Sequence, residues 1–203
     1  MKFSIVIASF LGAYPSASHQ RDQKIIRAIN SVLAQTFTDF EVIVVADGCP
    51  QTIEIVKDLP VRSFLIERKA LFTGGPRNKG IDEAKGEYVV YLDIDDIYGR
   101  NHLKIIADQL EDFDWVWYND IRYNPRLKIW YDNDCDIKQV GRHGTSNICH
   151  RASLKTRWEF KGYAHDHYFV QRLLDNPNYK RIAPPEYYVC HIPGTQSSGG
   201  YDL

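Results

Sequence analysis

The fold is decided by the stretch Gly86-Glu87-Tyr88-Val89-Val90-Tyr91-Leu92-Asp93-Ile94-Asp95-Asp96-Ile97-Tyr98. Its apolar run, Tyr88 to Leu92, is short, continuous and rich in β-branched and aromatic residues, which is typical of a strand buried on both faces. A glycine precedes this run and carboxylates follow it directly. We therefore predict a central strand of a parallel sheet that ends in a cluster of acids.

Three acids, Asp93, Asp95 and Asp96, crowd the carboxyl end of this strand. Like charges at such short spacing repel one another and raise one another's pKa, unless a positive group lies between them. Oxygen ligands with this spacing suit Mg²⁺ or Mn²⁺, whose remaining positions water and substrate phosphates fill. The alternative is that the acids cap the following helix, although a cap requires only one acid. The pattern favours the metal site.

The chain before this stretch alternates between predicted strands and predicted helices. Strands are expected over residues 3–8, 41–46 and 61–66, and helices over residues 24–35 and 53–59. Such alternation predicts βαβ units, whose ligands lie at the carboxyl ends of the strands. Ser9, Asp47 and the acids at 93–96 are therefore expected to meet at one edge of the sheet.

A turn-rich stretch, residues 73–80, precedes the acidic strand and is expected to lead into a short helix over residues 81–85. Its glycines permit close approach of the backbone, and Arg77 and Lys79 supply positive charge before the acidic edge. Arg77 is predicted to face a phosphate, and a surface ion pair is the alternative.

The second half of the chain gives weaker patterns. Helices are expected over residues 102–110, 152–156 and 167–174, strands over 115–118 and 146–150, and a small antiparallel excursion that lines an acceptor cleft between 121 and 144. Asp166 lies just before the last of these helices, where an N-cap is the alternative to a functional role. His191 follows a final apolar strand that begins at Tyr187, as the acids follow theirs.

Length and composition bound the classes of protein that this chain can belong to. The 203 residues suffice for one well-packed domain, and a net charge of −1 predicts no nonspecific attraction to nucleic acid or to an anionic membrane. No segment is apolar for long enough to span a bilayer, so we expect a soluble, cytoplasmic protein unless a flanking region anchors it. The four cysteines show no C-x-x-C spacing, which favours reduced, buried thiols.

The chain resembles the family-2 glycosyltransferases, whose GT-A fold has a Rossmann-like, mostly parallel central sheet flanked by helices. The resemblance rests on residues 4–9, 28–40 and 44–48, and on 77–96 with its Asp-x-Asp element, Asp93-Ile94-Asp95. It spans nearly the whole chain. It implies a single GT-A domain over residues 1–203, in which residues 1–100 bind the nucleotide sugar and residues 101–203 bind the acceptor.

The resemblance implies a role for each matching residue near the donor. Asp47 accepts a hydrogen bond from the base, most often from uracil N3–H, and Ser9 lies under the same nucleotide. Asp93 faces the ribose or the metal shell, and Asp95 is a direct ligand of Mn²⁺ or Mg²⁺ that bridges to the diphosphate. The implied activity is inverting transfer of a sugar from a nucleoside-diphosphate donor, a UDP-sugar above all, to an acceptor hydroxyl of a glycan or another molecule.

Two further residues follow from the resemblance on the acceptor side. Asp166 matches the general base that removes the proton of the acceptor hydroxyl, and His191 matches a residue that completes the metal site in part of the GT-A proteins. A core histidine at a strand end is the alternative for His191. The chain departs from the family at Ala46, which replaces the usual first acid, and at His165, which stands where a glutamate precedes the base. It also stops just after the GT-A core, so the acceptor site is minimal or the chain is one module of a longer protein.

Two other functions remain open. A sugar nucleotidyltransferase also uses a strand-end acid and Mg²⁺, but it is expected to carry a glycine-rich, basic loop directly after the first strand, and residues 10–14 hold one glycine and no basic residue. A non-catalytic module that binds nucleotide sugars is distinguished by metal-dependent binding without turnover. Fold alone does not decide among these functions.

Overall fold

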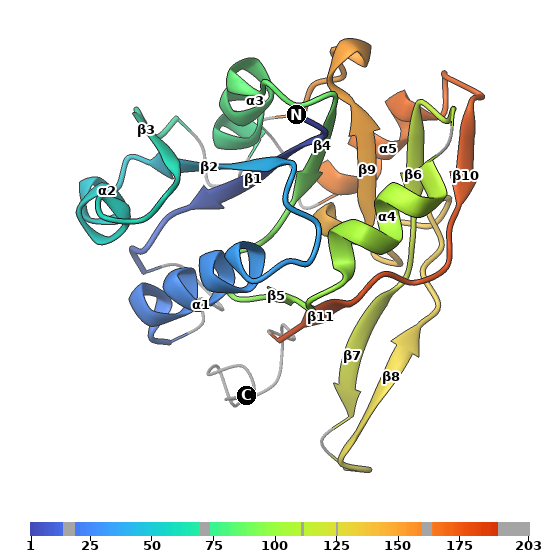
Figure 1. Cartoon of the computed structure of the whole chain (residues 1–203), viewed down its shortest axis with the longest axis horizontal. Helices are drawn as coiled ribbons and strands as arrows, with labels where there is room; N and C mark the ends of the chain where they lie inside the picture. Colours follow the sequence, from blue (N-terminus) through green and yellow to red (C-terminus); the bar gives the residue numbers. More distant parts are fainter. Residues whose placement is uncertain (14–18, 70–73, 111, 125, 160–163, 191–203) are drawn as a thin grey trace.

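A seven-stranded sheet forms the centre of the computed structural model, which describes residues 1–13, 19–69, 74–110, 112–124, 126–159 and 164–190. The strand order is β10-β6-β9-β4-β1-β2-β3 (Figure 1). The bounds are β1 Phe3–Ser9, β2 Phe40–Asp47, β3 Arg62–Ile66, β4 Tyr88–Tyr91, β6 Trp115–Trp117, β9 Ile148–Arg151 and β10 Tyr179–Arg181. β9 runs antiparallel to its neighbours β4 and β6, and the other pairings are parallel. The predicted mostly parallel sheet is confirmed.

β1 lies between β4 and β2, and all of its residues are buried. Phe3 pairs with Phe40 of β2 and with Tyr88 of β4, so the three strands start level with one another and run in the same direction. Their carboxyl ends therefore share one edge of the sheet. The polar residues that follow each strand meet at this edge, as the sequence predicts.

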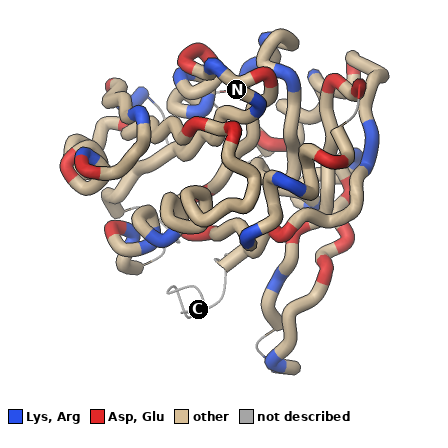
Figure 2. Tube along the Cα trace, in the orientation of Figure 1, with Lys and Arg blue, Asp and Glu red and all other residues tan. Residues whose placement is uncertain are grey.

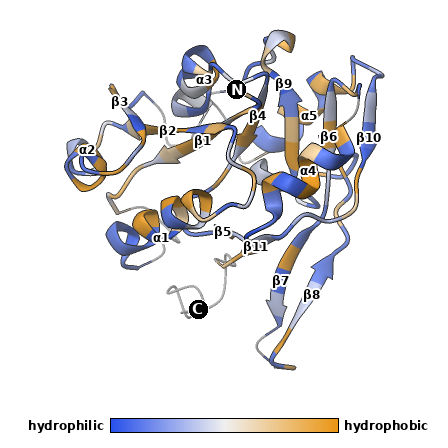
Figure 3. Ribbon diagram, viewed as in Figure 1, coloured by the Kyte–Doolittle hydropathy of each residue, from blue (hydrophilic) through white to orange (hydrophobic). Residues whose placement is uncertain are grey.

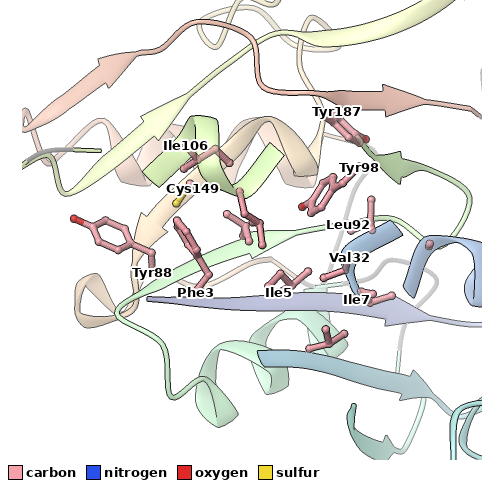
Figure 4. Packing of buried hydrophobic residues seen from close by; sticks show 14 of the residues in the cluster. Phe3, Ile5, Ile7, Val32, Tyr88, Leu92, Tyr98, Ile106, Cys149 and Tyr187 are labelled. Carbon is pink, nitrogen blue, oxygen red and sulfur yellow. The ribbon is translucent and has the colours of Figure 1, made fainter. Parts of the chain in front are cut away.

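Helices cover both faces of the sheet (Figure 1). On one face, α1 (Arg21–Leu33), α2 (Pro50–Val56) and α4 (His102–Leu110) pack against the side chains of β1 that point to this face. Figure 4 shows Ile5 and Ile7 beside Val32, and Phe3 beside Tyr88. On the other face, α3 (Gly74–Glu83) and α5 (His165–Leu173) pack against Val6 and its neighbours. Figure 3 shows the hydrophobic colour along the inner strands, which are the continuous apolar runs of the sequence.

A second, four-stranded sheet lies beside the first and has the order β5-β11-β7-β8. Its strands are β5 Ile97–Tyr98, β11 Tyr187–Val189, β7 Asp120–Asn124 and β8 Ile129–Asn133. The hairpin of β7 and β8 is antiparallel and projects from the body of the protein (Figure 1). The predicted antiparallel excursion is therefore present, and its role beside an acceptor stays a prediction.

The region before the acidic strand differs from its prediction. Residues 74–83 form helix α3, whereas the sequence analysis expected a turn as far as residue 80 and a helix from residue 81. Pro76 is tolerated because it lies in the first turn, where its missing N–H has no helical partner. Gly80 faces β1, and a Cβ atom there would lie 2.3 Å from Cγ1 of Val6. The glycine thus permits close helix–strand packing and does not mark a turn.

Several other boundaries differ from the prediction. α1 begins at Arg21 and α5 begins at His165, each earlier than predicted. The expected helix over residues 152–156 is a single 3₁₀ turn, Ala152–Leu154, and a second such turn, Thr145–Asn147, precedes β9. β10 was not predicted. No helix of the described residues has both the length and the apolar character that crossing a membrane requires.

His150 generates a prediction for the stability of the core. Its ring is buried, its Nε2 lies 2.7 Å from the hydroxyl of Tyr91, and its Nδ1 lies 3.0 Å from the carbonyl of Arg151. Burial lowers the pKa of His150 to about 4, whereas an unfolded histidine takes up its proton near pH 6.5. The unfolded state therefore binds the proton first as the pH falls, and the folded state loses stability between pH 6.5 and pH 4.

We expect the free energy of unfolding to fall by about 2 kcal/mol more in the wild type than in His150→Gln between pH 7 and pH 5. Urea unfolding of both proteins at the two pH values measures this difference. The other histidines are common to both proteins, so their contribution cancels. An equal drop in the two proteins would contradict the buried, neutral imidazole.

Candidate active site at the carboxyl edge of the sheet

The three acids after β4 lie in three different environments. Asp93 has a side chain that is 39% exposed and accepts a hydrogen bond of 2.8 Å from Arg77 Nη2. Asp96 is buried and accepts hydrogen bonds from the Tyr187 hydroxyl at 2.5 Å and from the Cys190 backbone N–H at 2.8 Å. Burial, and then the charges of Asp95 and Asp93, raise the pKa of Asp96 well above its usual range. Asp96 therefore ties β11 to the strand end and does not face the site.

Asp95 differs from the other two acids in the partners of its side chain. Its residue is half-buried, its backbone carbonyl accepts a hydrogen bond of 2.9 Å from Arg27, and its carboxylate has no hydrogen-bond or ion-pair partner among the described residues. A carboxylate held at a strand end without a protein partner fits a divalent cation, which needs one or two carboxylates when phosphates and waters complete its shell. Asp93 lies two residues away and is partly exposed.

No group of three or more His, Cys, Asp or Glu side chains within the described residues converges on a point where a metal could bind. His191, the third predicted ligand, lies outside the described residues, so its role stays a prediction.

The ends of β1 and β2 place Ser9 and Asp47 at the same edge. The Ser9 hydroxyl is buried and lies 2.9 Å from the Thr52 hydroxyl at the start of α2. Asp47 is buried, with a carboxylate oxygen 3.8 Å from Arg68 Nε. Burial raises the pKa of Asp47, and the charge of Arg68 acts against that rise. Arg68 therefore favours the ionised carboxylate that could accept a hydrogen bond.

Arg68 and Phe10 are site residues that the sequence analysis missed. Arg68 follows β3, and the centre of its guanidinium lies 3.3 Å from the centroid of the Phe10 ring, a cation–π contact beside Asp47. Gly48 makes this arrangement possible, because its φ is +63° and a Cβ atom there would lie 2.7 Å from Cβ of Arg68. The Asp-Gly pair at 47–48 signals a tight turn in the sequence, but no sequence pattern indicates that Arg68 folds back over it.

Arg77 lies at the centre of the site. Its side chain is only 5% exposed, so it is no surface ion pair. Besides its bond to Asp93, its Nη1 lies 2.9 Å from Nε2 of His165, and its guanidinium centre lies 4.9 Å from the centroid of the Trp158 ring. Arg77 thus joins the end of β4 to the first turn of α5. The prediction that it faces a phosphate remains a prediction.

Asp166 lies in the first turn of α5 and is half-buried. The N-cap of this helix is Ala164, and no side chain caps it, so the structure does not give Asp166 the N-cap role. Its Oδ1 accepts a hydrogen bond of 2.8 Å from the His167 backbone N–H. Through His165 and Arg77, the segment that carries Asp166 is connected to the segment that carries Asp93.

The comparison with known protein families covers the residues of this site. The family model described as Glycosyl transferase family 2 matches residues 17–172, which is most of the chain. The chain belongs to glycosyl transferase family 2. The match includes both Asp95 and Asp166, and it confirms the family that the sequence motifs resemble.

Relatives and solved structures support this assignment. An uncharacterized glycosyltransferase of Nostoc sp. is 31% identical over 149 residues, which are 71% of this chain and 42% of that protein. The poly(ribitol-phosphate) β-N-acetylglucosaminyltransferase TarS of Staphylococcus aureus is 32% identical over 114 residues, which are 53% of this chain and 18% of TarS. The chain therefore spans less than half the length of these relatives.

Solved structures confirm the GT-A fold. TarS 1–349 in complex with UDP-GlcNAc superposes with a TM-score of 0.73 at 21% identity and covers 100% of this chain and 62% of that one. The mannosyltransferase PcManGT from Pyrobaculum calidifontis, in complex with GDP-Man and Mn²⁺, gives a TM-score of 0.67 at 16% identity over 97% of this chain and 58% of that one. At these identities the likeness shows the fold alone.

Asn78, the neighbour of Arg77, generates a prediction for the integrity of the site. Its side-chain amide donates to the Trp158 carbonyl at 2.9 Å and accepts from the Trp158 N–H at 2.8 Å. Because Trp158 is buried, Asn78→Ala leaves two backbone groups without partners, and we expect a loss of about 2 to 4 kcal/mol in the free energy of unfolding. The matched control, Asn30→Ala on the exposed face of α1, is expected to change stability by less than about 0.5 kcal/mol. Similar urea midpoints for the two variants would contradict this role.

Proposed function

We propose that the protein transfers a sugar from a nucleoside-diphosphate donor, a UDP-sugar above all, to an acceptor hydroxyl with inversion at the anomeric carbon. The observation that carries this proposal is the arrangement at one edge of the sheet. The buried Asp47 ends β2, Asp95 lies after β4 with no described partner for its carboxylate, and Asp166 lies in the first turn of α5, which Arg77 joins to Asp93. Family membership supports glycosyl transfer as the reaction class. Solved structures of the same fold bind UDP-GlcNAc and, with Mn²⁺, GDP-Man.

In this proposal, residues 1–100 hold the donor. Asp47 accepts a hydrogen bond from uracil N3–H, and the charge of the neighbouring Arg68 acts against the rise that burial causes in the pKa of this carboxyl. Ser9 lies under the nucleotide, and its hydroxyl is hydrogen-bonded to that of Thr52. A nucleotide whose base carries no N–H at this position does not form this hydrogen bond with Asp47, which disfavours its binding.

Asp95 would hold Mn²⁺ or Mg²⁺, and Asp93 would contribute to the ribose contact or to the metal shell. A divalent cation at this position supplies the positive charge that stabilises the diphosphate as it leaves. The free carboxylate of Asp95 is the observation on this chain that fits such an ion, because no positively charged side chain among the described residues pairs with it.

Residues 101–203 contribute the acceptor side, and Asp166 acts there as the general base. A carboxylate that takes the proton from the acceptor hydroxyl, as that oxygen attacks the anomeric carbon opposite the diphosphate, gives a single displacement with inversion. The half-buried position of Asp166 allows contact with a bound acceptor. In Figure 2, positive and negative residues are interspersed along the trace of the described chain, so bulk charge does not favour a polyanionic acceptor.

The donor site is tested by a thermal-shift screen of nucleotides and nucleotide sugars with and without Mn²⁺. We expect UDP or a UDP-sugar with Mn²⁺, at about 100 times its Kd, to raise the unfolding midpoint by about 5 to 10 °C, because it binds the native state only. Asp95→Ala is expected to lose this shift, and Asp108→Ala, which removes an exposed acid on α4, is expected to keep it. The absence of a shift with every nucleotide would contradict the donor site.

The general base is tested by Asp166→Asn. We expect the rate of transfer to fall by about 10²- to 10⁴-fold while the affinity for the donor is unchanged, because the amide preserves the shape of the side chain but accepts no proton. Asp175→Asn, which alters an exposed acid just beyond α5, serves as the control. Transfer at the wild-type rate by Asp166→Asn would place the base elsewhere. The anomeric configuration of the product, read by NMR, tests inversion separately.

A further inference from the structure

The contact between Arg77 and His165 defines the protonation state of His165. An arginine guanidinium carries only N–H donors and stays charged in proteins. Its Nη1 lies 2.9 Å from His165 Nε2, so this ring nitrogen must be the acceptor and must carry no proton. The proton of a neutral His165 therefore lies on Nδ1. A protonated His165 would direct an N–H at the N–H of Arg77 and would place two positive charges in contact.

The same contact orients the first turn of α5. The body of the helix is held by Phe169, whose ring stacks on Trp158 at 3.9 Å between centroids and an interplanar angle of 2°. The first turn lies ahead of this contact, and its N-cap, Ala164, offers no side-chain cap. His165, in this turn, contacts Arg77 of α3, and it directly precedes Asp166. The segment that carries Asp166 is thus joined to α3 through the Arg77–His165 hydrogen bond.

Arg77 is itself fixed from several sides, which makes it a firm anchor. It is bonded to Asp93 at 2.8 Å, it lies over the Trp158 ring, and its neighbour Asn78 binds the backbone of Trp158 through both amide atoms. A guanidinium that is buried and held by a carboxylate on one side loses little entropy when it donates to a second partner on the other. Arg77 can therefore hold the first turn of α5 at a fixed distance from the end of β4.

We propose that His165 is a positioning residue, which as a neutral hydrogen-bond acceptor of Arg77 holds Asp166 at a fixed place relative to Asp93. This inference rests on the proposed function, in which Asp93 belongs to the donor side and Asp166 is the base. A displacement of about 1 Å between such groups can cost about 10²-fold in rate. The contact with Arg77 thereby links the donor half of the site to the acceptor half.

The experiment compares two replacements of His165 that differ in one property. The side chain of Gln keeps an oxygen that can accept from Arg77, and the side chain of Leu fills similar space but accepts nothing. With UDP-sugars and Mn²⁺, and UDP release as the readout, we expect kcat of His165→Gln to stay within about threefold of the wild type and kcat of His165→Leu to fall by about 10²-fold, with the donor KM unchanged in both. Equal kcat values for the two variants would overturn the proposal.

A double-mutant cycle separates positioning from a general loss of folding. In the Asp166→Asn background no base is left to position, so we expect His165→Leu to cause little further loss of kcat. A further loss of about 10²-fold in that background would show that His165 acts independently of Asp166 and would overturn the proposal. The unfolding midpoint of each variant in urea shows whether the native state is retained.

A structural readout tests the hydrogen bond without turnover. In the ¹⁵N-histidine NMR spectrum of the full chain at neutral pH, we expect His165 as the neutral tautomer protonated at Nδ1, and we expect this tautomer preference to weaken in Arg77→Met. A wild-type His165 protonated at Nε2 would overturn the inference even if the enzyme is active. A wild-type protein with the expected tautomer that releases no UDP from any nucleotide sugar would instead overturn the proposed function, and with it the positioning role.

Discussion

The parallel pairing of β4, β1 and β2, with both faces of β1 covered, is the constraint on which the rest of the structure depends. A strand that is buried on both faces can carry no polar side chain along its length without a partner, so functional residues are confined to its ends. Parallel direction then brings those ends together. Ser9, Asp47 and Asp93 owe their common edge to this register and to no interaction of their own.

A polar group that is fully buried at this edge requires a partner. Glu41 and Ser4 show the same rule at the opposite end of the strands, where the Ser4 hydroxyl donates to Glu41 at 2.7 Å and Arg62 pairs with that acid at 2.7 Å. At the carboxyl end the partners are Arg68 for Asp47 and Arg77 for Asp93. The difference lies in exposure, because Asp93 is partly open to solvent and can exchange a protein partner for a ligand.

The sequence alone predicted the strands of the first half, the parallel sheet and the family, because continuous apolar runs and strand-end acids are local patterns. It failed at α3, where glycine and proline suggest a turn and the packing of Gly80 against Val6 gives a helix. It also failed to find β10, a three-residue strand whose pairing with β6 comes from residues distant in the chain. Local propensity is weak in such short elements, and tertiary contacts override it.

The candidate site was predictable to the same degree. Acids that follow apolar runs could be placed at the edge from their position alone, whereas Arg68 and Phe10 are recognised only by what they touch. His165 stood out as a departure from the family motif, but its contact with Arg77 could not be predicted. Arg68 lies 21 residues beyond Asp47 in the chain, and nothing in its neighbourhood distinguishes it from other basic residues. The contacts of Arg68 and His165 form between elements that are distant in the chain, so a local sequence pattern does not predict them.

The three acids after β4 differ in how their carboxylates are paired with other groups of the protein. Within the described residues, Arg77 compensates Asp93, and two hydrogen-bond donors satisfy the buried Asp96, whose raised pKa reduces its tendency to ionise. No described residue pairs with the Asp95 carboxylate, although its backbone carbonyl accepts a hydrogen bond from Arg27. A carboxylate without a positively charged partner is stabilised when a cation binds beside it. This difference among three chemically identical acids supports the proposal that Asp95, and not Asp96, holds the cation.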